Sequence, residues 1–220
     1  MNYAQLTEAI KGYVENDFPT ITFSEGSFTS AEQIARFVEM AEQRIYNTVQ
    51  FPALRKNSTG TLTSSNKYLA TPSDFLSTYS LAVVDGSGNY HYLLNKDVNF
   101  MREAYPNPSS TGLPVHYAYF DDNTFILGPT PDSGYAVELH YFYYPESIVT
   151  AGTSWLGDNF DSVLLNASLL EAAIFMKAEQ DLMAEYNNRY VQSLAIFKNL
   201  GDGKLRGDAY RDGQIKVAAV

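Results

Sequence analysis

Histidines and closely spaced carboxylates are the residues of this chain that could do chemistry, because they serve as metal ligands and as acid–base groups. The three histidines, His91, His116 and His140, fall in strand-like segments, and no two are separated by a metal-ligand spacing. This pattern favours three separate packing or surface positions over a zinc site. We therefore expect no metal and no cofactor.

Two acidic pairs have the residue types of a glycosidase, namely Asp121 with Asp122 and Asp158 with Asp161. Glycoside hydrolysis needs two carboxyl groups that face each other across the substrate. Adjacent aspartates in a turn usually point apart into solvent, and Asp158 is better explained as the N-cap of a helix. The sequence therefore predicts no catalytic residues, and a cell-wall hydrolase is disfavoured.

Composition indicates a globular protein. The chain has 220 residues, of which 45% are hydrophobic and 18% charged, enough for one core or one core with a small satellite. It contains no cysteine, which excludes disulfides and thiolate metal sites. The first residues lack the basic and apolar regions of a signal peptide, and no apolar run is long enough for a membrane span.

Charge is unevenly distributed along the chain. Residues 1–200 hold 11 basic and 22 acidic side chains, whereas residues 201–220 hold 4 basic and 3 acidic ones. Nonspecific DNA binding comes mainly from Lys and Arg side chains that neutralise phosphates. The net negative charge of residues 1–200 therefore argues against a surface that binds nucleic acid nonspecifically.

Helices are expected at both ends of the chain. Apolar residues at helical spacing predict one over residues 3–14, and a capping box at Thr29 and Glu32 predicts a second that Pro52 stops. A third is expected to begin at Asp158. Its apolar stripe continues to residue 197 with a break near 177–181, so a helical hairpin and one long rod both remain open. Gly201 and Gly203 are expected to end the helical region.

Short β-branched and aromatic runs fill the middle of the chain, between residues 57 and 144. Six strands are predicted, at residues 59–63, 81–84, 90–94, 115–120, 124–127 and 135–144. Residues 85–89 and 121–123 have the Gly, Asn and Asp content of hairpin turns, and residues 96–105 suit a helical turn. Because the links are short, the natural prediction is an antiparallel meander.

Aromatic residues are crowded in the later strands. The crowd exceeds what one small core needs, which favours a protein–protein interface, with sugar binding on exposed tyrosines as the alternative. Its members are Tyr117, Tyr119, Phe120, Phe125, Tyr135, Tyr141, Phe142, Tyr143 and Tyr144.

Three segments of this chain carry a family resemblance. They are the helix SAEQIARFVEMAEQRIYNTVQFPAL, the strand block GLPVHYAYFDDNTFILGPTPDSGYAVELHYFYYP and the helical block TSWLGDNFDSVLLNASLLEAAIFMKAEQDLMAEYNNRYVQSLAIF. These segments closely resemble the head-to-tail adaptor proteins of short-tailed bacteriophages. The resemblance spans residues 29–197 and consists of many small matches rather than one motif. It implies a virion structural protein of the phage neck, located at the head–tail junction and assembled in the host cytoplasm.

The resemblance also implies partners. Such proteins bind the portal protein as a ring of identical copies, dodecameric in the family, and extend the DNA channel. They carry a platform for the tail nozzle or fibre proteins. DNA would pass without specific binding, no membrane is involved, and no catalytic residue carries over. The alternative function is a carbohydrate-binding or fibre-associated module with exposed tyrosines.

The sequence thus predicts an α+β fold, a helical bundle of N- and C-terminal helices with an antiparallel β-rich insertion and an extended C-terminal arm. The expected boundaries are 1–56 for the N-terminal helices, 57–150 for the β-rich domain, 151–200 for the C-terminal helices and 201–220 for the arm. The arm is expected to bind the portal or a neighbouring subunit through its basic and apolar residues, Lys204, Arg206, Arg211, Ile215, Lys216 and Val217.

Overall fold

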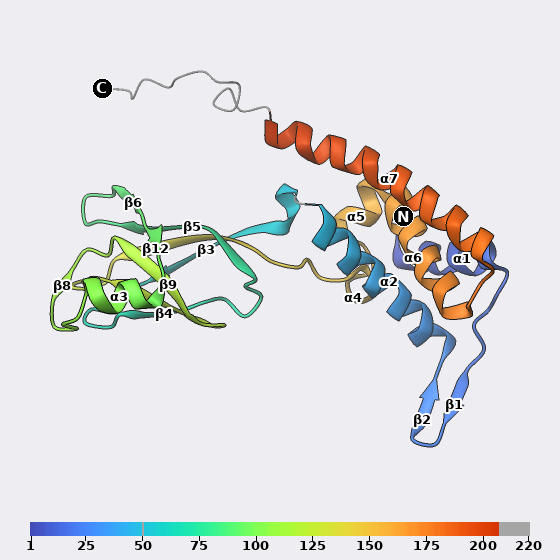
Figure 1. Ribbon diagram of the computed structural model, residues 1–220, viewed down its shortest axis with the longest axis horizontal. Helices are drawn as coiled ribbons and strands as arrows, with labels where there is room; N and C mark the ends of the chain where they lie inside the picture. The colour runs from blue at the N-terminus through green and yellow to red at the C-terminus, as the bar shows by residue number, and fades with distance from the viewer. Residues whose placement is uncertain (50, 207–220) are drawn as a thin grey trace. The chain divides into compact units, whose positions relative to one another are not determined.

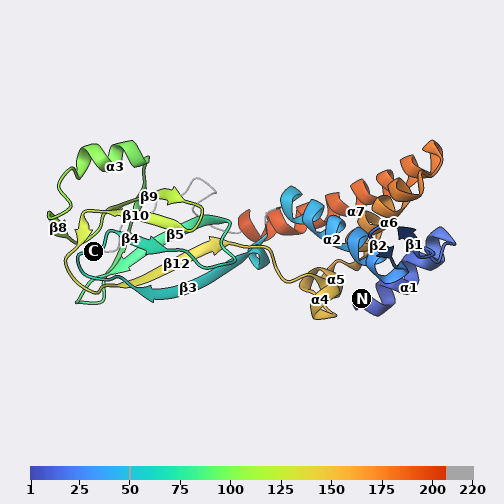
Figure 2. The same ribbon diagram turned by 90° about the horizontal axis from the view of Figure 1, so that it is seen from below.

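The computed structural model describes residues 1–49 and 51–206, with only the backbone for 200–206 (Figures 1 and 2). The chain divides into two compact units. One, the helical unit, comprises Met1–Ala53 together with the chain from Pro145 onward, and the other, the β unit, is Leu54–Tyr144. The fold is mixed α+β, as the sequence predicted.

The helical unit contains six α-helices and one hairpin within its described residues. The helices are α1 (Tyr3–Val14), α2 (Ser30–Thr48), α4 (Ile148–Ala151), α5 (Trp155–Asn159), α6 (Asp161–Met176) and α7 (Gln180–Arg206). The hairpin pairs β1 (Ile21–Phe23) with β2 (Gly26–Phe28) between α1 and α2, and a 3-10 turn, η1 (Pro52–Leu54), leads into the β unit.

Capping boxes begin the first two helices. In α1 the Asn2 side chain accepts from the Gln5 amide, and the Gln5 side chain accepts in return. In α2 the Glu32 carboxylate accepts from the Thr29 amide at 2.8 Å, while Thr29 Oγ1 accepts from Glu32. Both exchanges satisfy amides that a helix start leaves unpaired. The predicted start of α2 is confirmed.

Helix α6 is the centre of the helical unit, because α1, α2 and α7 all pack on it. Most of its side chains are buried, including Leu164, Ala167 and Leu169. An ion pair between Arg44 of α2 and Glu171 of α6 supports this packing. The turn at Lys177, which has a positive φ, separates α6 from α7, so the region is a helical hairpin and not one rod.

Two predictions about the C-terminal helices are wrong. Asp158 lies inside α5, whose N-cap is Ser154, and α6 begins after Phe160 without a side-chain cap. Which side chain caps the helix depends on where the chain turns into α5, and the local sequence pattern around Asp158 did not show that turn. Likewise α7 continues past Gly201 and Gly203 to Arg206. A glycine inside a helix costs about 1 kcal/mol, which a helix with a packed apolar stripe can tolerate.

The β unit holds two four-stranded sheets and a short two-stranded one. In the first, the order is β3 (Arg55–Thr61), β12 (Ala136–Phe142), β5 (Ser77–Val84), β6 (Tyr90–Tyr92). In the second it is β4 (Tyr68–Ala70), β10 (Thr124–Gly128), β9 (His116–Asp121), β7 (Leu94–Asn95). The third pairs β8 (Thr111–Gly112) with β11 (Thr130–Pro131), and α3 (Val98–Ala104) lies between β7 and β8 in the chain.

The meander prediction is therefore wrong. The last strand, β12, inserts between β3 and β5, which buries its alternating Val137, Leu139 and Tyr141 beside two neighbours instead of one. Strands β7 and β9 pair in parallel, because α3 and the loop after it return the chain to the same end of the sheet. The two predicted hairpin turns are confirmed, joining β5 to β6 and β9 to β10.

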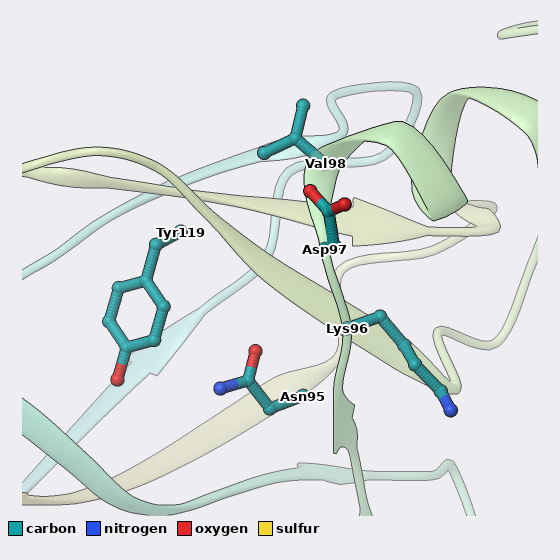
Figure 3. A pocket seen from close by; sticks show the side chains of 5 residues that line it. All are labelled: Asn95, Lys96, Asp97, Val98 and Tyr119. Atoms are coloured by element: carbon teal, nitrogen blue, oxygen red, sulfur yellow. The ribbon is translucent and has the colours of Figure 1, made fainter.

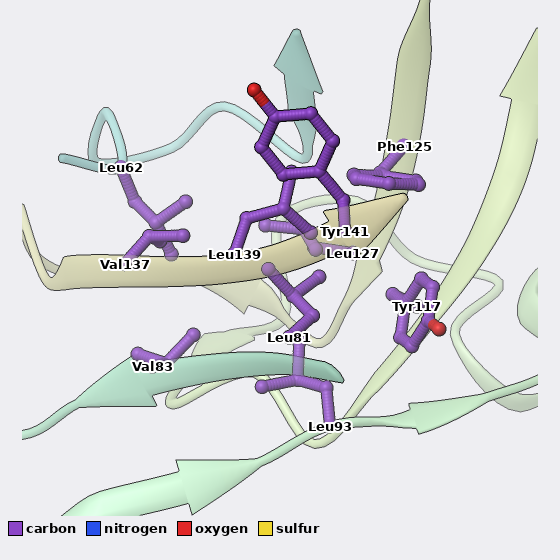
Figure 4. Packing of buried hydrophobic residues seen from close by; sticks show 10 residues of the cluster. All are labelled: Leu62, Leu81, Val83, Leu93, Tyr117, Phe125, Leu127, Val137, Leu139 and Tyr141. Carbon is purple, nitrogen blue, oxygen red and sulfur yellow. The ribbon is translucent and has the colours of Figure 1, made fainter. Parts of the chain in front are cut away.

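The core of the β unit lies between the two four-stranded sheets, which contribute inward side chains to one cluster (Figure 4). Of the aromatic crowd, Tyr117, Phe125 and Tyr141 are buried here. By contrast, Tyr119 and Phe120 are exposed. The cluster consists of Leu62, Leu81, Val83, Leu93, Tyr117, Phe125, Leu127, Val137, Leu139 and Tyr141.

Candidate interaction surfaces

The three histidines each have a different neighbour. His91 Nε2 lies 2.9 Å from the Asp85 carboxylate, and His116 Nδ1 lies 2.7 Å from the Tyr105 hydroxyl. The ring of His140 packs edge-on against Tyr79. Across the part of the chain that the structure describes, no three His, Asp or Glu side chains are grouped to hold a metal ion.

The aspartates at the two hairpin turns accept hydrogen bonds from backbone amides of the same turns. Asp85 accepts from the amides of Ser87 and Asn89, and its contact with His91, followed by its bonds to Asn89 and Ser87, holds the pKa of Asp85 well below its usual range. Asp121 accepts from the Asn123 amide in the same way. These contacts close the two hairpin turns.

A cavity of about 570 Å³ in the β unit contains one carboxylate (Figure 3). It is lined by Asn95, Lys96, Asp97, Val98 and Tyr119. The carboxylate is that of Asp97, and it caps α3 by accepting from the Asn99 amide at 3.1 Å. With no second carboxylate to work as acid or base in this cavity, it lacks the pair that glycoside hydrolysis needs.

Hydrogen bonds from α2 anchor the hairpin β1–β2 of the helical unit at its base. At its base, Gln33 of α2 is buried and its amide group donates to the carbonyls of Phe28 at 2.9 Å and Pro19 at 3.1 Å. The Ser30 hydroxyl donates to the Asp17 carbonyl at 2.6 Å. Toward the turn, Phe23 is 59% exposed. An apolar tip on a fixed base is suited to contact a partner.

Helix α7 presents a second apolar surface. Its buried stripe includes Tyr186, Tyr190 and Phe197, while Val191 and Ile196 on other positions are exposed. Exposed apolar residues on a helix that is already packed on one side provide contact area for another molecule.

Over residues 1–53 and 145–200 the chain has 14 acidic and 6 basic side chains, so the helical unit carries most of the negative charge.

The outward face of the first sheet carries exposed aromatic side chains. Tyr90 and Tyr92 of β6 and Tyr79 of β5 are each more than half exposed. The Arg55 guanidinium stacks 4.1 Å from the centre of the Tyr79 ring, and Phe142 lies beside them. Of these residues only Phe142 belongs to the aromatic crowd; Tyr79, Tyr90 and Tyr92 come from strands before it.

A buried carboxylate joins two distant parts of the helical unit. Glu42 of α2 is 3% exposed and accepts from the Ile148 amide at 3.0 Å, at the start of α4. Burial raises the pKa of Glu42, and its bonds to Ser147 and Ile148 offset part of that rise. Sequence reasoning missed Glu42 and Gln33. The available signal was a polar residue beside apolar positions of the predicted α2.

The residues predicted for the binding arm are largely outside the described chain. Arg211, Ile215, Lys216 and Val217 lie beyond residue 206. Lys204 and Arg206 lie in the last turns of α7 instead of an extended segment. Within residues 1–49 and 51–206, no helix has the length and apolar character to cross a membrane.

A family model gives the identity of the chain. The model of the SU10 adaptor protein family matches residues 1–214, nearly the whole sequence and both units. This chain belongs to the SU10 adaptor protein family. The match confirms the resemblance to phage head-to-tail adaptors, so this adaptor is a bacteriophage structural protein and a virion component. None of the curated proteins compared with this adaptor matches it.

Proposed function

We propose that this adaptor forms a ring of identical copies beneath the portal, extends the DNA channel and carries the attachment platform for tail nozzle or fibre proteins. The observation that carries the proposal is the family match over residues 1–214, which spans both the helical unit and the β unit. A dodecamer is the proposed stoichiometry. The proposed place of assembly is the host cytoplasm, and the adaptor acts without a cofactor and without catalysis.

Exposed apolar surfaces at two places on the helical unit support lateral contacts between copies. One is the β1–β2 hairpin, where Phe23 is exposed beside the turn, and the other is α7, where Val191 and Ile196 are exposed on the two flanks of its buried stripe. Both are backed by packed structure, so they are presented without a large cost of ordering the backbone.

Acidic charge supports a passive DNA channel. Every favourable contact with a phosphate would retard moving DNA, and a net negative wall makes few such contacts. The same charge opposes association of free copies, because like charges repel. We therefore expect a monomer or weak oligomer in isolation, and a ring when the portal provides additional contacts.

Light scattering of the purified adaptor, alone and with a phage portal, tests the proposal. The expected result is a small species alone and a ring-sized complex that co-sediments with the portal. A closed, stable ring without the portal contradicts template-driven assembly. If the adaptor does not bind the portal at all, the proposed function is wrong.

The exposed tyrosines of the first sheet favour one alternative function, a carbohydrate-binding or fibre-associated module. Tyr79, Tyr90 and Tyr92 are each more than half exposed, although the Arg55 guanidinium covers one side of the Tyr79 ring, and exposed tyrosine rings suit stacking on a sugar. A glycan array probed with the adaptor in the absence of portal decides this. Binding that Tyr92→Ala abolishes supports the alternative.

A further inference from the structure

A groove opens along one side of the β unit, between an edge strand of each sheet. Its volume is about 290 Å³, and Ser58 and Gly60 of β3, Leu69 of β4, and Val137 and Leu139 of β12 are among the residues that line it. Val137 and Leu139 belong to the core cluster. The groove therefore leads from the surface to the apolar interior between the sheets.

Small residues on β3 leave this groove open. In the β3–β12 register, Gly60 lies opposite Val137 and Ser58 lies opposite Leu139, so both point inward between the sheets. Inward positions of a strand usually carry large apolar side chains. A Cβ atom built at Gly60 would meet no atom within 4 Å. The space that two large inward side chains of β3 would fill is therefore empty of side-chain atoms at this edge.

Hydrogen-bonding groups are available on both sides of the groove. Among residues 1–49 and 51–206, strand β3 pairs only with β12 and β4 only with β10, so within this part of the chain each has one unpaired backbone edge. The Thr71 hydroxyl, which also lines the groove, is buried without a hydrogen-bond partner. Free strand edges are templates for an added strand.

One end of β3 is closed by a polar cluster. The Lys56 ammonium lies 2.7 Å from the Asp74 carboxylate, and the Tyr141 hydroxyl donates to the same carboxylate at 2.8 Å. By the β3–β12 register, Lys56 also stands on the inward face, opposite Tyr141. An occupant is therefore apolar over Ser58 and Gly60 and ends before Lys56.

We propose that the free edge of β3 receives residues 214–220 of a second copy of this chain as an added strand. The copy-to-copy arrangement rests on the proposed ring. The segment reads Gln-Ile-Lys-Val-Ala-Ala-Val, with Ile215 and Val217 two residues apart. In an extended strand these two point to the same face, spaced like Ser58 and Gly60, and fill the groove that the two small residues leave.

Charge fits this occupant. Residues 207–213 connect the end of α7 to this segment, and seven residues in extended conformation would reach about 23 Å. With Ile215 and Val217 inward, Lys216 points to the outer face of the sheet. There Glu138 stands opposite Thr59, providing a negative charge.

Disulfide cross-linking between copies tests the proposal, because the natural chain has no cysteine. A Ser58→Cys chain and a Val217→Cys chain are mixed with the portal and oxidised. We expect a covalent dimer from Ser58→Cys with Val217→Cys, and little from the control pair Asn57→Cys with Val217→Cys, because Asn57 does not line the groove and lies opposite His140 on the other side of the sheet. Equal yields from the two pairs overturn the proposal.

Two further outcomes also overturn it. A cross-link only inside one chain that carries both substitutions shows that the segment binds its own β unit. A cross-link of Val217→Cys to the portal, with none to Ser58→Cys, places the segment on the portal. Co-sedimentation of the adaptor with the portal is measured on the same samples, so loss of the ring is distinguished from loss of this contact.

A groove-filling substitution provides an independent test. Gly60→Val, added to the Ser58→Cys chain, is expected to lower the cross-link yield about tenfold, as when one buried branched side chain is excluded. The matched control is Ser80→Val, on the outward face of the same sheet opposite His140, which should leave the yield unchanged. If Gly60→Val does not fold, Gly60→Ala replaces it. An unchanged yield with a folded variant refutes the proposal.

Discussion

The anchoring of the β1–β2 hairpin depends on one buried side chain, and Gln33→Leu tests it. The amide group of Gln33 donates to the carbonyls of Phe28 and Pro19, which belong to the two sides of the hairpin base. Leucine has a similar size and helix propensity but no donor. The substitution therefore leaves two backbone carbonyls without their partner while the helix keeps its shape.

The expected loss follows from those two bonds. Each hydrogen bond contributes about 1 kcal/mol net, and an acceptor left unpaired in a partly buried place adds to the cost. The larger apolar surface of leucine offsets a fraction of this. We expect Gln33→Leu to lower the free energy of unfolding by about 2 kcal/mol.

Urea unfolding and hydrogen exchange together measure this effect. Amides of residues 21–28 should exchange faster in Gln33→Leu, whereas those of α6 should change only as far as global stability does. The matched control is Gln43→Leu, because Gln43 lies on the same helix and is exposed. If the two variants have the same stability, or if hairpin exchange is unchanged, the anchoring argument is wrong.

Three further predictions test the packing of the helical unit. Gly157→Ala should lower the free energy of unfolding by about 1–3 kcal/mol, since the added Cβ would lie 2.6 Å from the Met1 carbonyl oxygen. Gly12→Ala in α1, where a Cβ would meet no atom within 4 Å, should raise it by up to about 1 kcal/mol, and thermal unfolding compares the two variants. The unmodified adaptor should lose stability as pH rises above 4.5, because a carboxyl whose pKa is raised in the folded protein holds its proton more tightly there than in the unfolded chain, and Glu42→Gln should remove this loss. Urea unfolding of both proteins between pH 4 and 8 measures it, and the same dependence of stability on pH in the two proteins would contradict the prediction. Ser154→Ala should cost about 1 kcal/mol as the lost cap of α5, and Asp158→Ala less than half of that; the reverse order in urea unfolding would restore Asp158 as the cap.

Local signals in the sequence predicted α1 and α2. Apolar spacing indicated α1, and the start of α2 is fixed by two residues three positions apart, Thr29 and Glu32, so the residues of the sequence pattern are the residues in contact. The hairpin turns at 85–89 and 121–123 have the same local origin, with an aspartate accepting from amides two to four residues later. The family resemblance likewise needs only the order of residues, and the family match confirms it.

Strand order was decided by contacts that no local pattern contains. The strand β12 lies between β3 and β5 although about 80 residues of chain separate it from β3, since pairing on both edges buries its alternating side chains more completely. The sequence predicted six strands, which overlap β3, β5, β6, β9, β10 and β12, but joined them in order, because short links favour neighbours. It also could not show which capping residue, Ser154 or Asp158, stands at a helix start.

The interaction surfaces depend most on tertiary structure. Glu42 meets Ile148 across 106 positions of sequence, and the groove beside β3 exists only because Ser58 and Gly60 are brought opposite Leu139 and Val137. The sequence by itself determined the start of α2, the two hairpin turns and the family. In the helix start and the turns, the interacting groups lie within a few residues of one another. Only the folded chain decided which polar residues are buried and which apolar ones remain exposed, because burial is set by neighbours far away in the sequence.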